Sequence, residues 1–462
     1  MTRANHRTAH RAGALGATAT LVASMAVAFL SLGSGSADAA TAVPSAAVPT
    51  VVLAAPVAGI HGPYTTTTDE CASCHRVHTG KDANLLKSPV PQSNLCFTCH
   101  DGTGGPDVLV QYTSAPANNA TTRDVYSHDA RVTTSHTLAT DATEFQGVLN
   151  RHSECADCHN PHQANPTAGT QTATGWTPSG RLAGISGVSV SNGPTVITPT
   201  FLDGTTTPIN REYQLCFKCH SGFTTLTSNT GFAPSKWRLD KAAEFNPANL
   251  SYHPVEAPGT NTTAKMAASL AGASPYKLSE SFTTGSTIRC SNCHTSSIKY
   301  PVTPPAAGGD LPTHTSQYRG ILLRNYQDRE LKSATAPYAD ADFALCYLCH
   351  TNSPFNGSGD TTATNFSLHG LHVTGIAGRG SGGTDLSIDT AGAGQGNAIC
   401  AECHFRLHST AYGTPSGSRL VNFAPNVQPN GLATPSWTST GTGSGSCSLT
   451  CHGHAHNRSY SP

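Results

Sequence analysis

The stretch from Cys155 to His162, which reads CADCHNPH, places two cysteines three positions apart with a histidine directly after the second. This spacing is the attachment signature of a c-type haem, in which two thiols bond the porphyrin vinyl groups and the histidine ligates the iron. Cys155 and Cys158 would hold the porphyrin, and His159 would bind its iron. His162 cannot reach the far face of the same haem. We therefore expect His162 to bind the iron of a neighbouring haem.

All 16 cysteines of the chain fall into pairs of this kind, and a histidine follows each pair at once. Zinc ribbons and disulfide frameworks also use paired cysteines, but neither needs a histidine at that position. The sequence therefore predicts eight covalently attached haem c groups. The attaching cysteines are Cys71, Cys74, Cys96, Cys99, Cys155, Cys158, Cys216, Cys219, Cys290, Cys293, Cys346, Cys349, Cys400, Cys403, Cys447 and Cys451. The motif histidines expected to ligate iron are His75, His100, His159, His220, His294, His350, His404 and His452.

The last pair, Cys447 and Cys451, has three intervening residues instead of two. A slightly larger ring could still span the two vinyl carbons of a porphyrin. The alternative is a local disulfide without haem.

The motifs also pair at a higher level. The first motif of a pair is followed by a further histidine, and the second is preceded by leucine, as in LCFTCH at Cys96. The third pair departs from this pattern, because Thr-Ser-Ser and no histidine follows His294. The chain is therefore interpreted as a signal peptide, residues 1–39, and four dihaem repeats over residues 40–125, 126–248, 249–364 and 365–462.

The second ligands of the irons are expected to be histidines. Methionine is the other common axial ligand and raises the reduction potential, but beyond the N-terminal leader the chain has one, Met266. At most one haem can use it, and the rest should be bis-histidine and low in potential, or open. The expected second ligands are His61, His78, His128, His152, His162, His253, His369, His372 and His408. Further candidates are His136, His314, His454 and His456, with His314 favoured as the substitute for the histidine missing after His294.

Nine plus four gives thirteen candidates for eight irons. No iron is then forced to lack a second ligand, and this favours electron transfer over chemistry at an open iron. No catalytic residue is predicted.

The composition points to an exported chain without a large peptide core. Charged residues make up 12% of the sequence, against about 25% in typical soluble domains. Three arginines precede an apolar run from Gly13 to about Leu32, and small residues follow up to Ala39. This is typical of a signal peptide, with a retained membrane anchor as the alternative. We expect no integral membrane segment after cleavage, and a periplasmic, cell-surface or extracellular location. The near-neutral charge gives no indication of a nucleic-acid partner.

The expected fold is mainly irregular and loop-rich, with short α-helices and a few β-hairpins wrapped around a chain of haems. Short helices are predicted at residues 210–220 and 338–350, where Asp340 or Asp342 could cap the start. Alternating valines and isoleucine around Asn192-Gly193-Pro194 predict a β-hairpin over residues 187–201.

The pairing of CxxCHxxH with a following LCxxCH resembles the doubled-CXXCH multihaem cytochromes c of bacteria, over roughly residues 60–457. That family includes secreted electron conduits and extracellular cytochrome filaments. The resemblance implies closely spaced haems wrapped by a thin polypeptide that carries electrons and is not an enzyme. It also implies other redox proteins or cytochromes, or extracellular electron acceptors, as partners. In a homopolymer, His61, His454 and His456 would be placed to reach a neighbouring copy.

Two other functions stay open from the sequence. One is an octahaem reductase of a nitrogen or sulfur oxyanion, which would need an open haem, and such enzymes often have lysine in place of the motif histidine. No CxxCK occurs here. The other is a structural surface protein in which haem only folds the chain.

Overall fold

The computed structural model describes residues 61, 71–82, 84–89, 91–113, 126–128, 130–131, 153–171, 176–193, 197–223, 240–305, 311–326, 339–375, 398–409, 418–424, 427, 434–441, 444–451, 454–456 and 459–460. All of them belong to one compact unit, residues 55–462. The expected signal peptide lies outside the described residues. Within the described segments, no helix is both long enough and apolar enough to cross a membrane.

Half of the described helical elements carry motif cysteines, and four of these are single turns that begin at the first cysteine of a motif. In six motifs the histidine N–H donates to the carbonyl of the first cysteine at 2.8–3.1 Å. Residues three apart lie on the same face of such a turn, so both thiols of a motif can bond one porphyrin. These elements are α2 (Ser93–Cys96), α4 (Cys155–Cys158), α5 (Glu212–His220), α8 (Cys290–Cys293), the 3₁₀ turn η4 (Cys346–Leu348) and α9 (Cys400–Cys403).

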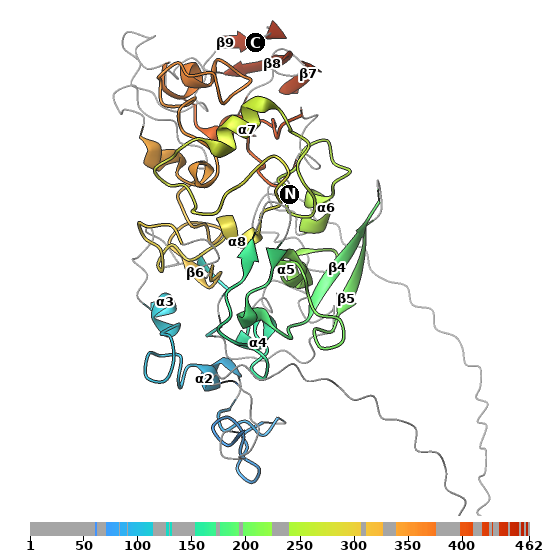
Figure 1. Cartoon of the computed structure of the whole chain (residues 1–462), viewed down its shortest axis with the longest axis vertical. Coiled ribbons are helices and arrows are strands. Elements are labelled where there is room, and N and C mark those ends of the chain that lie inside the picture. Colours follow the sequence, from blue (N-terminus) through green and yellow to red (C-terminus); the bar gives the residue numbers. More distant parts are fainter. Residues whose placement is uncertain are drawn as a thin grey trace, which may run out of the picture. The chain divides into compact units, whose positions relative to one another are not determined.

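The remaining helical elements position loops between motifs. Side-chain caps begin three of them. Asp240 accepts from the N–H of Ala243 and Thr263 from the N–H of Met266. Ser179 accepts from the N–H of Arg181. These remaining elements are α3 (Leu109–Thr113), η2 (Gly180–Leu182), α6 (Lys241–Phe245), α7 (Ala264–Ala271), η3 (Asp340–Phe343) and the π-helix η5 (Leu371–Gly375). Figure 1 shows these short elements joined by long irregular segments, which confirms the expected loop-rich fold.

The predicted helices are only partly regular. The one at 210–220 is confirmed as α5. The one at 338–350 is instead two separate 3₁₀ turns, η3 and η4. Asp342 does serve the start of the first turn, where its carboxylate accepts from the N–H of Ala339 at 3.2 Å.

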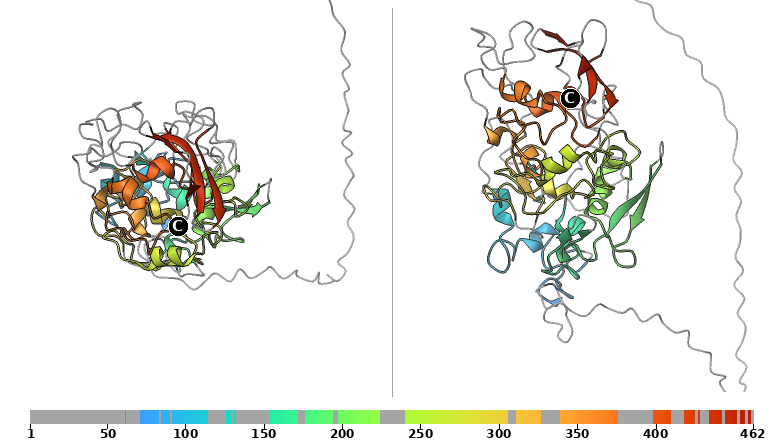
Figure 2. Two further views of the ribbon diagram at one scale, coloured as in Figure 1. Left: turned by 90° about the horizontal axis from the view of Figure 1, so that it is seen from above. Right: turned by 45° about the horizontal axis from the view of Figure 1, so that its top comes forward.

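The predicted hairpin is confirmed by the antiparallel strands β4 (Gly187–Asn192) and β5 (Ile197–Leu202), paired from Gly187 with Leu202 to Asn192 with Ile197. A second group of strands, separate from it in Figure 2, is formed by β7 (Ser436–Gly441), β8 (Ser444–Cys451) and β10 (Ser459–Tyr460), with β9 (His454–His456) also paired to β8. Two short pairings complete the described sheets: β2 (Thr170–Gln171) with β3 (Trp176–Thr177), and β1 (Tyr126–Ser127) with β6 (Thr315–Ser316).

The irregular last motif lies in a strand and not in a helical turn, since β8 runs from Ser444 to Cys451. Positions three apart in a strand point to opposite faces, whereas positions four apart share a face. The extra residue between the two cysteines is therefore compatible with the strand that carries them.

The apolar core is divided into small clusters beside the motifs, as the composition suggested. One gathers Val188, Phe217, Ala242, Phe245 and Val255. Another gathers Leu278, Phe282, Leu323, Leu345 and Leu348. Each includes residues from segments around two or more motifs, so the clusters join neighbouring motifs without forming one large peptide interior.

A buried polar network supports the third repeat. The Arg289 guanidinium pairs with the carboxylate of Glu280, and Asn292 donates to the other Glu280 oxygen at 2.8 Å. The side chains of the arginine and the glutamate are 8% and 5% exposed. Arg289 stands directly before α8 and Asn292 within it, so the network fixes the turn that carries Cys290 and Cys293.

We expect Glu280→Gln to lower the stability of the haem-loaded protein by about 3–5 kcal/mol, because the buried guanidinium loses its anionic partner. The guanidinium chloride midpoint, followed by circular dichroism, would measure the loss. Lys81→Met, at an exposed side chain, is the control and should change stability by less than about 0.5 kcal/mol. An unchanged midpoint in the glutamine variant would contradict this role for Glu280.

Candidate functional site

A single continuous cavity of about 3450 Å³ connects the motifs. Its walls include every cysteine whose side chain the structure describes, from Cys71 to Cys447. They also include all seven motif histidines from His75 to His404. The motifs thus share one interior space and do not form eight isolated sites.

Neighbouring repeats meet through their cysteines. The second motif of one repeat contacts the first motif of the next, as α2 packs against α4 and α5 against α8. Side-chain hydrogen bonds join Cys96 with Cys155, Cys216 with Cys290, and Cys346 with Cys400. Burial raises the pKa of the Cys158, Cys219 and Cys293 thiols to about 12. Without a bound metal, these three side chains are neutral thiols.

The described residues contain one group of three donors within 4.8 Å of one another, Glu212, Cys216 and Cys290. The carboxylate oxygens of Glu212 already accept from the N–H and the hydroxyl of Ser291, at 2.8 and 2.6 Å. The two thiols come from different motifs. This group therefore lacks the four free ligands that a structural zinc site needs.

Histidine rings face one another in pairs around the cavity. An imidazole nitrogen lies about 2.0–2.1 Å from a bound transition metal, so two imidazoles on opposite sides of one ion have ring centroids about 6 Å apart. Six pairs have this separation: His61 with His100 (5.9 Å), His75 with His162 (6.2 Å), His128 with His220 (6.1 Å), His159 with His314 (6.3 Å), His294 with His408 (6.1 Å) and His372 with His456 (6.4 Å).

Aromatic rings in general pack at 4.5–7 Å, so distance alone does not identify a metal ligand. Two further features are consistent with ligation of a metal. Five of the six pairs combine one motif histidine with one histidine from outside the motifs. In addition, a backbone carbonyl holds the Nδ1 atom of five of the seven described motif rings, which leaves Nε2 for a metal. The Nδ1 partners are the carbonyls of Asn84 for His75 (2.9 Å), Pro106 for His100 (3.2 Å), Arg181 for His159 (2.9 Å), Gly320 for His294 (2.7 Å) and Leu420 for His404 (3.0 Å).

Desolvation inside the cavity also favours the neutral form of five of its imidazoles, and a metal ligand must be neutral. Desolvation lowers the pKa of His220 to about 3 and those of His294 and His350 to about 4. The same cause lowers the pKa of His314 and of His369 to about 3. The donor set, the thiols in helical turns and the shared cavity all fit covalently attached haem.

A recurrent contact holds the histidines from outside the motifs in pairs. In each case the ring of one histidine donates to the carbonyl of the residue directly before the other. The contacts run from His61 to Pro161, from His128 to Thr313 at 2.8 Å, and from His253 to Leu407. The residues that follow these carbonyls are His162, His314 and His408. His314 therefore has the same place in its repeat as His162 and His408 in theirs.

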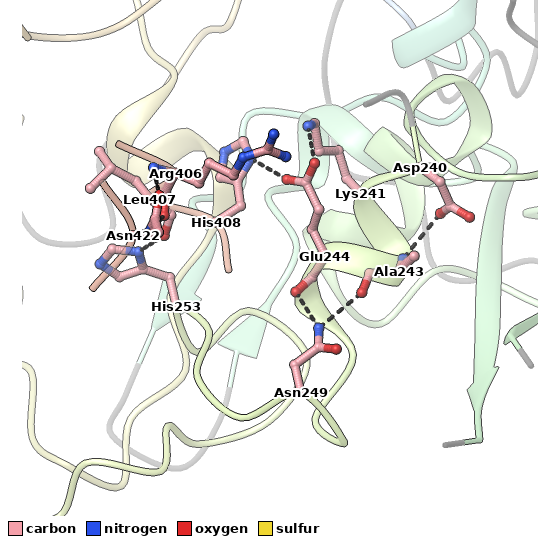
Figure 3. Close-up of polar contacts among 10 residues, drawn as sticks. All are labelled: Asp240, Lys241, Ala243, Glu244, Asn249, His253, Arg406, Leu407, His408 and Asn422. Carbon is pink, nitrogen blue, oxygen red and sulfur yellow. Dashed lines mark hydrogen bonds and ion pairs between the residues drawn. The ribbon is translucent and has the colours of Figure 1, made fainter. Parts of the chain in front are cut away.

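The backbone reinforces two of these contacts. The N–H of His128 donates to the carbonyl of His314 at 3.0 Å, next to the pairing of β1 with β6. The N–H of His253 donates to the carbonyl of His408, also at 3.0 Å. Figure 3 shows the His253 ring beside Leu407 and, on the other side, the His408 ring directed at Glu244.

The other expected ligands are placed as follows. His253 and His369 both line the cavity. The pKa of His350 is lowered by desolvation first and by His253 second. The pKa of His369 is lowered by desolvation first and by His404 second. Met266 also lines the cavity. His78 is exposed and does not line the cavity, so its expected role as a ligand gains no support from its position.

Several expected ligands are beyond what the structure describes. His136, His152 and His452 lie outside the described residues, and of Cys451 and His454 only the backbone, in β8 and β9, is described. Conversely, sequence reasoning did not identify Glu244, whose carboxylate contacts His408 from 164 positions away. No local pattern signals such a contact.

The comparisons with known proteins agree with this geometry. Residues 61–105, which contain the first two motifs, match the family model described as the doubled CXXCH motif. No curated protein and no solved structure matches the chain. The matched motif and its repetition along the sequence support a multihaem cytochrome c of the doubled-CXXCH kind.

Proposed function

We propose that the chain is an exported octahaem cytochrome c that conducts electrons through mostly bis-histidine, low-potential haems. The observation that carries this proposal is the set of six facing histidine pairs around one cavity that all described motif cysteines line. Haem, when bound there, supplies an iron that accepts and releases one electron.

The pairs suggest which histidines hold each iron. The histidine near the start of a repeat, before its first motif, serves the second motif of that repeat, as His61 faces His100 and His128 faces His220. We assign His253 to His350 in the same way. The histidine after the first motif serves the first motif of the preceding repeat, so His162 faces His75 and His408 faces His294.

His314 takes the second of these roles for the third repeat, because it faces His159. In the last repeat we assign His369 to His404, since both rings line the cavity and His404 contributes to the lowered pKa of His369, after desolvation. His372 faces His456, which lies in β9 beside the strand that carries Cys447. We propose His372 as the second ligand of the haem attached at Cys447.

This arrangement supports a carrier and not an enzyme. With imidazole from the chain as its second ligand, a bound haem would have a lower potential than one with a methionine ligand. The buried rings stay neutral, and the Nδ1 contacts fix their orientation. Electron transfer requires only that the motifs lie close together, which the cysteine contacts between repeats provide.

Location and partners belong to the same proposal. Haem attachment of this kind implies export, and we propose a periplasmic, cell-surface or extracellular site of action. Other redox proteins, further cytochromes or an extracellular acceptor would exchange electrons with it. The exposed histidine at position 78 and the exposed Cys71 leave the first motif accessible to such a partner.

A haem assay with a carbon monoxide titration tests the function. The pyridine haemochrome of the purified protein should give eight haems per chain. Spectra of the native protein should show these haems to be low-spin in both oxidation states. The reduced protein should bind no carbon monoxide. A count of seven would contradict attachment at Cys447. Stoichiometric binding of carbon monoxide at one haem would favour the oxyanion reductase instead.

Removal of one proposed ligand tests the assignment of pairs. We expect His314→Ala to convert one haem per chain to a high-spin form that binds one carbon monoxide when reduced, because His159 would lose the ring that faces it. Added imidazole should restore the low-spin spectrum. His78→Ala is the matched control and should leave the spectrum unchanged. A fully low-spin His314 variant would refute this pair.

A further inference from the structure

His408 follows the first motif of its repeat, and His314 takes the corresponding place in the third repeat. The Nδ1 atoms of these two histidines differ in what they contact. The His408 Nδ1 lies 2.8 Å from a carboxylate oxygen of Glu244. The His314 Nδ1 is buried and has no hydrogen-bond partner in the described part of the chain. Among the described histidines from His61 to His408, no other ring contacts a carboxylate; where their Nδ1 atoms have acceptors, these are carbonyl or hydroxyl oxygens.

Glu244 is held firmly in this contact. It belongs to α6, which Asp240 caps, and its side chain is 11% exposed. Its backbone carbonyl accepts from the amide of Asn249 at 2.7 Å, and its second carboxylate oxygen pairs with Lys241 at 2.7 Å. Figure 3 shows the carboxylate between the lysine and the His408 ring. The next residue, Phe245, packs against that ring with centroids 5.0 Å apart.

A carboxylate in this position changes the electronic character of the imidazole. It accepts the Nδ1 proton in a charge-assisted hydrogen bond, which makes the opposite nitrogen a stronger electron donor to a metal. A stronger donor stabilises ferric over ferrous iron, and hydrogen bonds to axial ligands are among the means by which proteins set haem potentials. Lys241 shares the same carboxylate and therefore moderates the effect.

We propose that Glu244, acting through His408, lowers the reduction potential of the haem attached at Cys290 and Cys293 relative to the haem attached at Cys155 and Cys158. The first haem has His408 as its second ligand, and the second has His314. This inference rests on the proposed bis-histidine ligation. Glu244 is a positioning residue, since it acts on the iron only through the imidazole.

The test is a spectroelectrochemical titration of the haem-loaded protein and its Glu244→Gln variant. Glutamine keeps the shape of the side chain but removes its charge. One haem in eight should move to a more positive potential, with the haem count and the low-spin spectrum unchanged. Near-infrared magnetic circular dichroism, which reports donation by axial imidazoles, should change for that haem alone. Unchanged potentials, or loss of low-spin ligation in the variant, would overturn the proposal.

One further variant tests the sign of the effect, and a second separates it from a general change of charge. Lys241→Met should move the same haem to a more negative potential, because the carboxylate then acts on His408 alone; a positive shift would count against the proposal. Glu212→Gln removes a buried carboxylate that bonds Ser291 and contacts no histidine. It should leave the near-infrared signal unchanged, and a signal change equal to that of the Glu244 variant would also overturn the proposal. A wild-type protein without low-spin haem would instead refute the ligation itself.

Discussion

Under the proposed bis-histidine ligation, the fold must meet one constraint: two neutral imidazoles have to face each other about 6 Å apart at each iron. One imidazole of each pair is fixed by its motif, because the helical turn that orients the thiols also ends at the histidine. The other must come from elsewhere in the chain. Its segment has to be brought in and held by contacts that do not depend on regular secondary structure.

The pairing of distant segments follows from this constraint. His128 and His314 are joined by a backbone hydrogen bond and by the short strands β1 and β6 beside them. His253 and His408 are joined by the same backbone contact without any strand. Long helices or wide sheets would hold such loops no better, and they would fill the space that porphyrin needs. The small apolar clusters and the loop-rich fold are thus consequences of how the ligands are supplied.

The sequence predicted those features that are determined locally. In most motifs a helical turn brings the cysteines and the histidine together, and the hairpin of β4 and β5 follows from the alternating apolar residues around Asn192-Gly193-Pro194. It did not predict long-range choices. His78 and His162 have the same local pattern, yet only His162 has a preceding repeat whose first motif it can face. Glu244 could not be identified, because its contact with His408 depends on the arrangement of the whole chain.

His314 shows why the pattern of residues and the pattern of positions can differ. In the contacts made by the rings of His61 and His253, the second histidine follows a motif histidine closely. His162 stands three residues after His159, and His408 stands four residues after His404. At His294 that histidine is absent, and His314 arrives from twenty positions further along the chain. It still follows directly after the carbonyl that the neighbouring ring contacts, at Thr313. The repeats therefore share the position of an imidazole in space and not its position in the sequence. In the third repeat, the pairing of β1 with β6 holds His314 at that position.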